Sequence, residues 1–133
     1  MLRRLYFCHG KEVITDLNVL MVEPGKTPYE TDIAPGLESL QKTVGGYIQE
    51  VYPFDDPVAI VCNEEGKLIG LEGNRRLGHD ILVGIFYVMS ENDEGELLSL
   101  TDEKIRYYSE RFWEPESFTQ QEIDATIGGF FVG

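Results

Sequence analysis

The sequence predicts a single α+β domain built on a mainly antiparallel sheet of about five to seven strands, with two or three helices. Short apolar or alternating runs are separated by turn residues, which is typical of strands joined in hairpins. Segments with helical spacing stand apart from these runs instead of alternating with them, as expected for α+β rather than α/β proteins. The 133 residues, 42% of them hydrophobic, suffice for one core.

The N-terminal third predicts a hairpin. Residues 2–8 resemble a short strand, and residues 12–17 are ambiguous between strand and loop. The apolar run 19–22 predicts a buried strand that stops at Pro24, and residues 29–33 alternate in the manner of a strand with one wet face. The short connection between the last two favours antiparallel pairing.

A helix is expected next. Pro35 fits a first helical turn, where its missing N–H costs nothing. Leu37, Leu40 and Val44 then share one face, and the glycine pair 45–46 ends the helix. Further strands are predicted over residues 47–52, 58–62, 67–71, 81–89 and 97–100. Residues 81–89 form the most apolar run of the chain and are expected to be the central strand.

The C-terminal part predicts two helices. Ile105, Tyr108 and Phe112 repeat at helical spacing after Thr101. Farther on, Thr119 and Glu122 form the three-residue spacing of a capping box, which predicts a second short helix.

The charge balance excludes several partners. Lys and Arg number 11 against 24 Asp and Glu, so the net charge is −13. Such a field repels phosphates, and we expect no direct binding to nucleic acid or to an anionic membrane. Residues 91–133 carry 11 acidic and 3 basic groups, a net −8. This excess is either a solvated face or a surface for a basic partner protein.

The cysteines and the hydropathy pattern indicate a compartment. Cys8 and Cys62 each lie in an apolar run outside any Cys-x-x-Cys pair, and we expect both to be buried thiols in a reducing environment. No apolar run approaches the ~20 residues of a membrane span. The sequence therefore predicts a cytoplasmic protein, and it leaves monomer and homodimer open.

One segment resembles a binding site. Residues 70–80 form a predicted loop that holds Asn74, Arg75 and Arg76 among glycines. Arginine side chains fork onto phosphates and carboxylates, so these three residues are candidate anion ligands. The alternative is that the arginines pair with the surplus carboxylates and that Gly and Asn serve a turn. Candidate pocket neighbours are Tyr52, Asn63 and His79.

Signs of catalysis and of metal binding are weak. The neighbours Cys8 and His9 would point to opposite faces of a strand, and His79 and Asp80 share this defect. A Gly-x-Ser-x-Gly elbow is absent, and Asp55 with its neighbour reads as a solvated bend between prolines. We therefore expect no metal and no cofactor, and we favour a role without catalysis.

Several stretches together are similar to the domain-of-unknown-function 3846 family. They are VEPGKTPY (22–29), LQKTVGGYI (40–48), VYPFDDPVA (51–59), VCNEEGK (61–67), LTDE (100–103) and the segment 112–118. The resemblance covers residues 18–118. It implies a bacterial accessory protein of mobile elements, and it supplies no catalytic residues.

Two departures from the family pattern affect the domain plan. Family members begin near Asn18, which makes residues 1–17 an N-terminal extension, with a strand that packs on the domain, and residues 18–133 the domain itself. The segment after Arg75 is shorter here than in the family. A site shaped by that segment would therefore be altered.

Two functional hypotheses follow. The preferred one is a non-enzymatic interaction protein that contacts a basic, DNA-handling partner through its acidic C-terminal third. The alternative is a small-anion or nucleotide-binding protein, or an enzyme, that uses the segment from Asn74 to Arg76.

Overall fold

The computed structural model describes residues 5–8 and 11–127, with side chains from residue 16 onward. In chain order its elements are β1 (Leu5–Cys8), β2 (Lys11–Thr15), β3 (Leu17–Val22), β4 (Tyr29–Ile33), α1 (Leu37–Val44), β5 (Ile48–Val51), β6 (Val58–Asn63), β7 (Gly73–Leu77), β8 (Asp80–Val83), β9 (Phe86–Glu91), β10 (Leu97–Leu98), α2 (Asp102–Arg111) and α3 (Gln120–Ile127).

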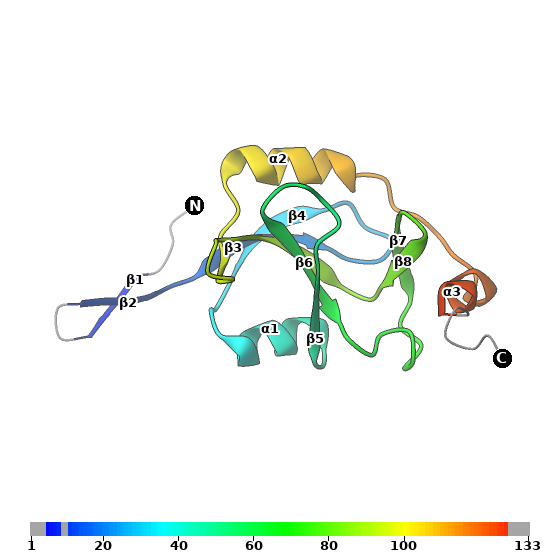
Figure 1. The fold of residues 1–133 in the computed structure, drawn as a ribbon, viewed down its shortest axis with the longest axis horizontal. Helices are drawn as coiled ribbons and strands as arrows, with labels where there is room; N and C mark the ends of the chain where they lie inside the picture. The colour runs from blue at the N-terminus through cyan, green and yellow to red at the C-terminus, as the bar shows by residue number, and fades with distance from the viewer. Residues whose placement is uncertain (1–4, 9–10, 128–133) are drawn as a thin grey trace.

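An antiparallel sheet of six strands forms the centre of the molecule. Its order is β4-β3-β9-β6-β5, and β10 pairs with the far end of β9. Every ladder in the described chain is antiparallel. The α+β class and the sheet of five to seven strands are therefore confirmed. β1–β2 and β7–β8 form separate two-stranded sheets (Figure 1).

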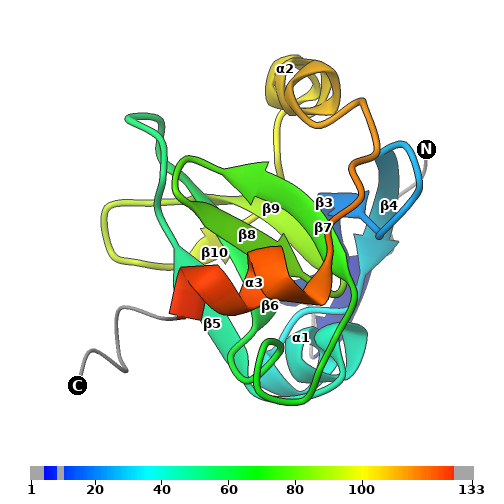
Figure 2. The ribbon, with the colours of Figure 1, turned by 90° about the vertical axis from the view of Figure 1, so that its right-hand side faces the viewer.

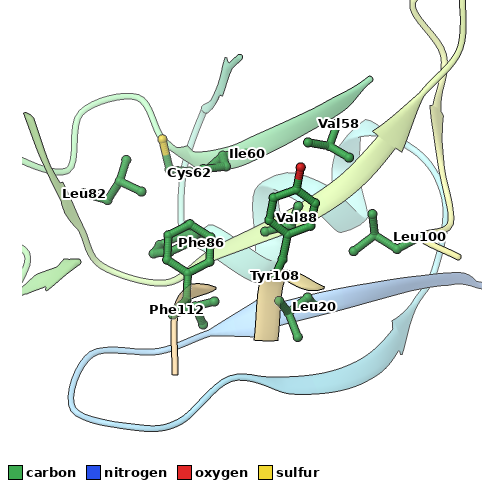
Figure 3. Close-up of a cluster of buried hydrophobic side chains, with 11 residues drawn as sticks. Leu20, Val58, Ile60, Cys62, Leu82, Phe86, Val88, Leu100, Tyr108 and Phe112 are labelled. Carbon is green, nitrogen blue, oxygen red and sulfur yellow. The ribbon is translucent and has the colours of Figure 1, made fainter. Parts of the chain in front are cut away.

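The central sheet is covered by one helix on each face (Figure 1). Side chains alternate along β3, so Leu20 and Val22 face α2 while Val19 and Met21 face α1. On the α2 side, the rings of Phe86 and Phe112 pack edge to face with centroids 5.3 Å apart (Figure 3). Leu40 and Val44 of α1 close the opposite face. Two apolar layers therefore sandwich the sheet.

The first helix begins later than the sequence predicts. Its N-cap is Gly36 and its first residue Leu37, so Pro35 stands outside the first turn. Leu37 is 58% exposed and does not belong to the buried face. The end of the helix is as predicted, because Gly45 adopts the left-handed conformation and its N–H bonds to the Gln41 carbonyl.

The middle of the chain corrects three expectations. Residues 67–71, predicted as a strand, belong to a turn that runs over residues 64–70 and its exit. The predicted loop 70–80 instead holds β7 and the start of β8. The apolar run 81–89 is not one strand, since it divides into β8 and β9 at Gly84. Only β9 is the central strand.

Gly84 causes this division. Its φ of +70° is strained for any residue with a side chain, and a Cβ there would lie 2.6 Å from Leu71 Cδ1. Its N–H bonds to the Glu72 carbonyl at 2.7 Å. On the N-terminal side of Gly84, β8 lies outside the central sheet, pairs with β7 and packs against α3.

The C-terminal helices start where the sequence predicts. Thr101 caps α2 by accepting a bond from the Lys104 N–H, and the Thr119–Glu122 capping box of α3 is formed from both sides. Ile81 and Val83 of β8 pack on Ile123 of α3 at one end of the domain (Figure 2). Among the described helices, none combines the length and the apolar character that crossing a bilayer needs.

The division of the chain at residue 17 stays a prediction. β3 begins at Leu17, and β1 and β2 pair only with each other in the described chain.

Replacing Gly84 with alanine should destabilise the protein strongly. The left-handed backbone alone costs about 1–2 kcal/mol, and the collision with Leu71 adds about 1–3 kcal/mol. Gly95→Ala is the matched control, because Gly95 has a φ of +81° with open space around it. In urea denaturation, the free energy of unfolding of Gly84→Ala should be well below that of Gly95→Ala. Equal free energies of unfolding would contradict this account of the strand break.

Candidate functional site

The structure places Arg75 inside the protein, where it is 1% exposed. Its Nε donates to the Phe112 carbonyl at 2.9 Å and its Nη2 to the Lys26 carbonyl at 2.6 Å. Nη1 donates to Asn74 Oδ1 at 2.8 Å and to the Asn74 carbonyl at 3.3 Å. The guanidinium therefore binds carbonyl oxygens of the end of α2, the β3–β4 turn and its own strand. Burial lowers its pKa, although Glu116 nearby favours the charged form.

Asn74 completes this buried cluster. Its side chain is fully buried, and Nδ2 donates to the carbonyls of Val22 at 3.0 Å and Gly84 at 2.8 Å. The amide therefore holds the strand break next to the end of β3. Asn74 and Arg75 together satisfy backbone groups that the divided sheet would leave without partners.

Arg76 is the exposed member of the predicted anion site. Its guanidinium lies 5.6 Å from the centroid of the Phe118 ring, and its backbone N–H faces the Glu116 carboxylate at 3.4 Å. Bonds from Thr119 lower the pKa of Glu122 most, and the charge of Arg76 lowers it a little further. The hypothesis of an anion site stays a prediction. Arg76 is the arginine of the predicted site that is exposed to an anion, and the carboxylates of Glu116 and Glu122 lie close to it.

The three predicted pocket neighbours lie apart. The Tyr52 hydroxyl contacts carboxylate oxygens of Glu50 at 2.7 Å and Glu91 at 2.9 Å, on the β5 side of the sheet. The Asn63 amide is buried and bonds to the Val44 carbonyl and the Glu65 N–H. His79 is exposed at the β7–β8 turn. Asn63 and His79 line one groove, and Tyr52 does not.

This groove is the most site-like feature of the described chain. It has a volume of about 730 Å³ and opens where β8 leaves the central sheet, between the 64–70 turn, β8 and the end of α3. Its apolar lining comes from several elements and includes Leu68, Leu77, Leu82 and Ile127. Gln49 and Cys62, which face each other across β5 and β6, line its far end. We call it the β8 groove.

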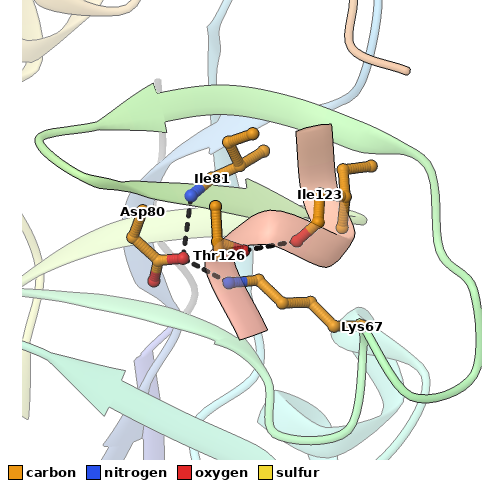
Figure 4. Close-up of polar contacts among 5 residues, drawn as sticks. All are labelled: Lys67, Asp80, Ile81, Ile123 and Thr126. Atoms are coloured by element: carbon orange, nitrogen blue, oxygen red, sulfur yellow. Dashed lines mark hydrogen bonds and ion pairs between the residues drawn. The ribbon is translucent and has the colours of Figure 1, made fainter. Parts of the chain in front are cut away.

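Polar groups converge on the β8 groove. Lys67 Nζ pairs with Asp80 Oδ1, which also accepts the Ile81 N–H at 2.8 Å (Figure 4). Glu64 adds a second carboxylate, whereas Lys67 is the one Lys or Arg in the lining. Burial raises the pKa of the Cys62 thiol to about 11, so it stays protonated at neutral pH and is a poor nucleophile.

A second concavity, of about 690 Å³, lies between the 53–56 loop and α2. Two of its charged groups, Asp56 and Lys104, already pair with each other. Asp56 accepts the Tyr108 hydroxyl at 2.8 Å and pairs with Lys104 at 3.1 Å. Both contacts lower the pKa of Asp56, the Tyr108 bond most. This arrangement ties α2 to the 53–56 loop.

Over residues 16–127, the structure brings together no group of three or more His, Cys, Asp or Glu side chains able to hold a metal ion. The pair of Cys8 and His9 lies outside the side chains that the structure describes.

Sequence reasoning missed the β8 groove because its lining runs from residue 49 to residue 127. The sequence feature that could have indicated the groove is the apolar pair Leu68 and Ile69 in the turn beside it, which are 74% and 59% exposed. In the sequence, these two adjacent apolar residues follow the turn residues 63–66 and Lys67, and this pattern predicts a strand.

Comparison with known proteins identifies a family. A family model described as a domain of unknown function (DUF3846) matches residues 16–113, close to the expected span 18–118. No curated protein and no solved structure matches the chain.

Arg75→Lys should destabilise the fold by about 2–4 kcal/mol, because an ammonium cannot reach the three separate carbonyl groups that the planar fork binds. Arg76→Lys, one residue away and exposed, should change the free energy of unfolding by about 0.5 kcal/mol or less. Chemical denaturation of both variants measures the contrast. Equal losses would show that the Arg75 contacts contribute little.

Because of Asp56, the free energy of unfolding should depend on pH. Its folded-state pKa is lowered, so the ionised carboxylate stabilises the fold above the ordinary value of 3.8, and the gain is lost as the pH falls through the lower folded pKa. Asp56→Asn should therefore be less stable than wild type at pH 7, and the difference should shrink below about pH 3.8. The effect is small because 37% of the side chain is exposed. Thermal unfolding at pH 7 checks this against Asp55→Asn on the exposed neighbour, which lacks the Tyr108 and Lys104 contacts and should cost less stability.

Proposed function

The chain belongs to the DUF3846 family, and we propose that it is a non-enzymatic binding protein that takes a basic, partly apolar segment of a partner protein in its β8 groove. The observation that carries the proposal is the groove itself. It combines apolar walls with a small number of converging polar groups, which is the usual character of a binding pocket. Its volume of about 730 Å³ falls in the range of known ligand sites.

Charge supports a basic occupant. The groove lining holds two carboxylates, and its one lysine is already paired with Asp80. The whole chain carries −13, so the long-range field also attracts cationic segments. The carboxylates of Glu64 and Asp80 therefore make the surroundings of the groove favour a cationic segment over an anionic one.

The apolar walls account for the other half of the proposed ligand. Leu68 is 74% exposed at the mouth of the groove, next to Ile69. Burying such side chains against a partner is favourable by about 25 cal/mol per Å² of apolar surface. The ligand therefore needs apolar side chains as well as charge.

The β8 groove is a better-defined site than the acidic C-terminal third. The exposed acidic residues of that third are divided among the β9–β10 turn, α2 and α3. α2 lies over one face of the sheet, whereas α3 lies at one end of the domain (Figure 1). A basic DNA-handling protein of a bacterial mobile element is the partner that we favour, because such proteins present cationic surfaces to phosphates. The cytoplasm is the compartment that suits a free, buried Cys62.

Fluorescence anisotropy with a labelled ten-residue peptide of alternating Lys and Val tests the proposal. Binding should weaken as salt rises, and a matched peptide of Glu and Val should bind far less. Leu68→Asp and Glu64→Lys should each weaken binding by about tenfold or more, which corresponds to about 1.4 kcal/mol.

Glu94→Lys is the control, since it makes the same charge change on the distant β9–β10 turn and should alter affinity by about twofold or less. Equal binding of the acidic peptide would overturn the proposal. An equal loss from Glu94→Lys and Glu64→Lys would also overturn it.

A further inference from the structure

The edge of the central sheet next to the β8 groove is open. In the described chain β5 pairs with β6 alone and ends the six-stranded sheet. An unpaired edge presents backbone donors and acceptors that can pair with another chain. Gln49 of this strand lines the β8 groove, so the open edge and the groove adjoin.

The register shows which backbone groups of β5 are free. The Glu64 N–H bonds to the Tyr47 carbonyl at 2.8 Å, which makes these two residues a hydrogen-bonded pair. Such pairs alternate along an antiparallel ladder, so Gln49 and Val51 exchange bonds with β6. Ile48 and Glu50 between them direct their N–H and C=O groups away from β6.

We infer that the partner segment binds as an added β-strand along β5, with alternate side chains entering the β8 groove; this inference rests on the proposed function. In this mode, main-chain bonds to Ile48 and Glu50 supply affinity, and pockets for every second side chain supply selectivity. One face of the added strand lies beside Gln49 and the groove. Its other face lies beside Glu50.

Charge complementarity fixes the chemistry of the added strand. The Glu50 carboxylate lies with that of Glu91 around the Tyr52 hydroxyl, and the single phenol proton can serve only one of them. A lysine or arginine opposite Glu50 would form a favourable cross-strand pair with whichever of the two carboxylates the Tyr52 proton does not serve. On the groove side, an apolar residue next to Gln49 would meet the apolar lining. Basic and apolar residues therefore alternate in the partner.

Exposed aromatic residues stand at both ends of the open edge. Tyr47 precedes β5 and is 66% exposed, and Tyr52 follows it and is 54% exposed. Tyrosine is enriched at protein–protein interfaces because it buries a large apolar ring and keeps a polar tip. The residues that line the β8 groove include none from β4, the other edge strand of the sheet.

Amide hydrogen exchange by NMR, with and without the Lys–Val peptide, tests the inference. At saturation, exchange at Ile48 and Glu50 should slow by about tenfold or more, while Gln49 and Val51, already bonded to β6, should change little. Protection of β4 amides instead would overturn the inference. Slow exchange of Ile48 and Glu50 in the protein alone, growing with its concentration, would also overturn it, because a second copy would then cover the edge.

Two backbone changes make the test independent of the side chains. Glu50→Pro removes the outward N–H at a position where an edge strand tolerates proline, and it should weaken peptide binding by about tenfold beyond the matched Glu50→Gln. A peptide N-methylated on the side that pairs with β5 should lose affinity for the unaltered protein. If the peptide binds in the groove but neither change matters, the added strand is wrong and the proposed function stands. If the unmodified peptide does not bind, the proposed function fails.

Discussion

The guanidinium of Arg75 joins three segments that no ladder connects. It binds the Lys26 carbonyl in the β3–β4 turn and the Phe112 carbonyl after α2, and it does so from within β7. A buried cation is costly unless its donors are satisfied, and here carbonyl oxygens satisfy it in place of a carboxylate. This one side chain therefore helps to fix the position of α2 over the sheet, and with it the core around Phe112.

The strand break at Gly84 depends on the same cluster. Asn74 holds the Gly84 carbonyl against the end of β3, and Gly84 in turn allows β8 to leave the sheet. The β8 groove opens in the gap that this departure creates. Asn74 and Arg75, which resemble a ligand site in the sequence, thus stabilise the strand break beside which the β8 groove lies.

Local signals predicted the local structure well. The β3–β4 hairpin, the end of α1 at Gly45 and the capping box of α3 all follow from short patterns, because turns and caps are decided by neighbouring residues. The run 81–89 predicts one strand because its continuous hydrophobicity gives no sign of the positive φ of Gly84. The role of Arg75 was out of reach for another reason, because its carbonyl partners lie 37 and 49 residues away in the chain.

These long separations also bear on how the protein folds. The Arg75 contacts can form only after the chain from Lys26 to Phe112 has been brought together, which costs loop-closure entropy before any bond is gained. Contacts between such distant segments are made only after this closure, so they form late in folding. The Arg75 cluster therefore acts mainly on the unfolding rate, which it slows, and has less influence on the rate of refolding.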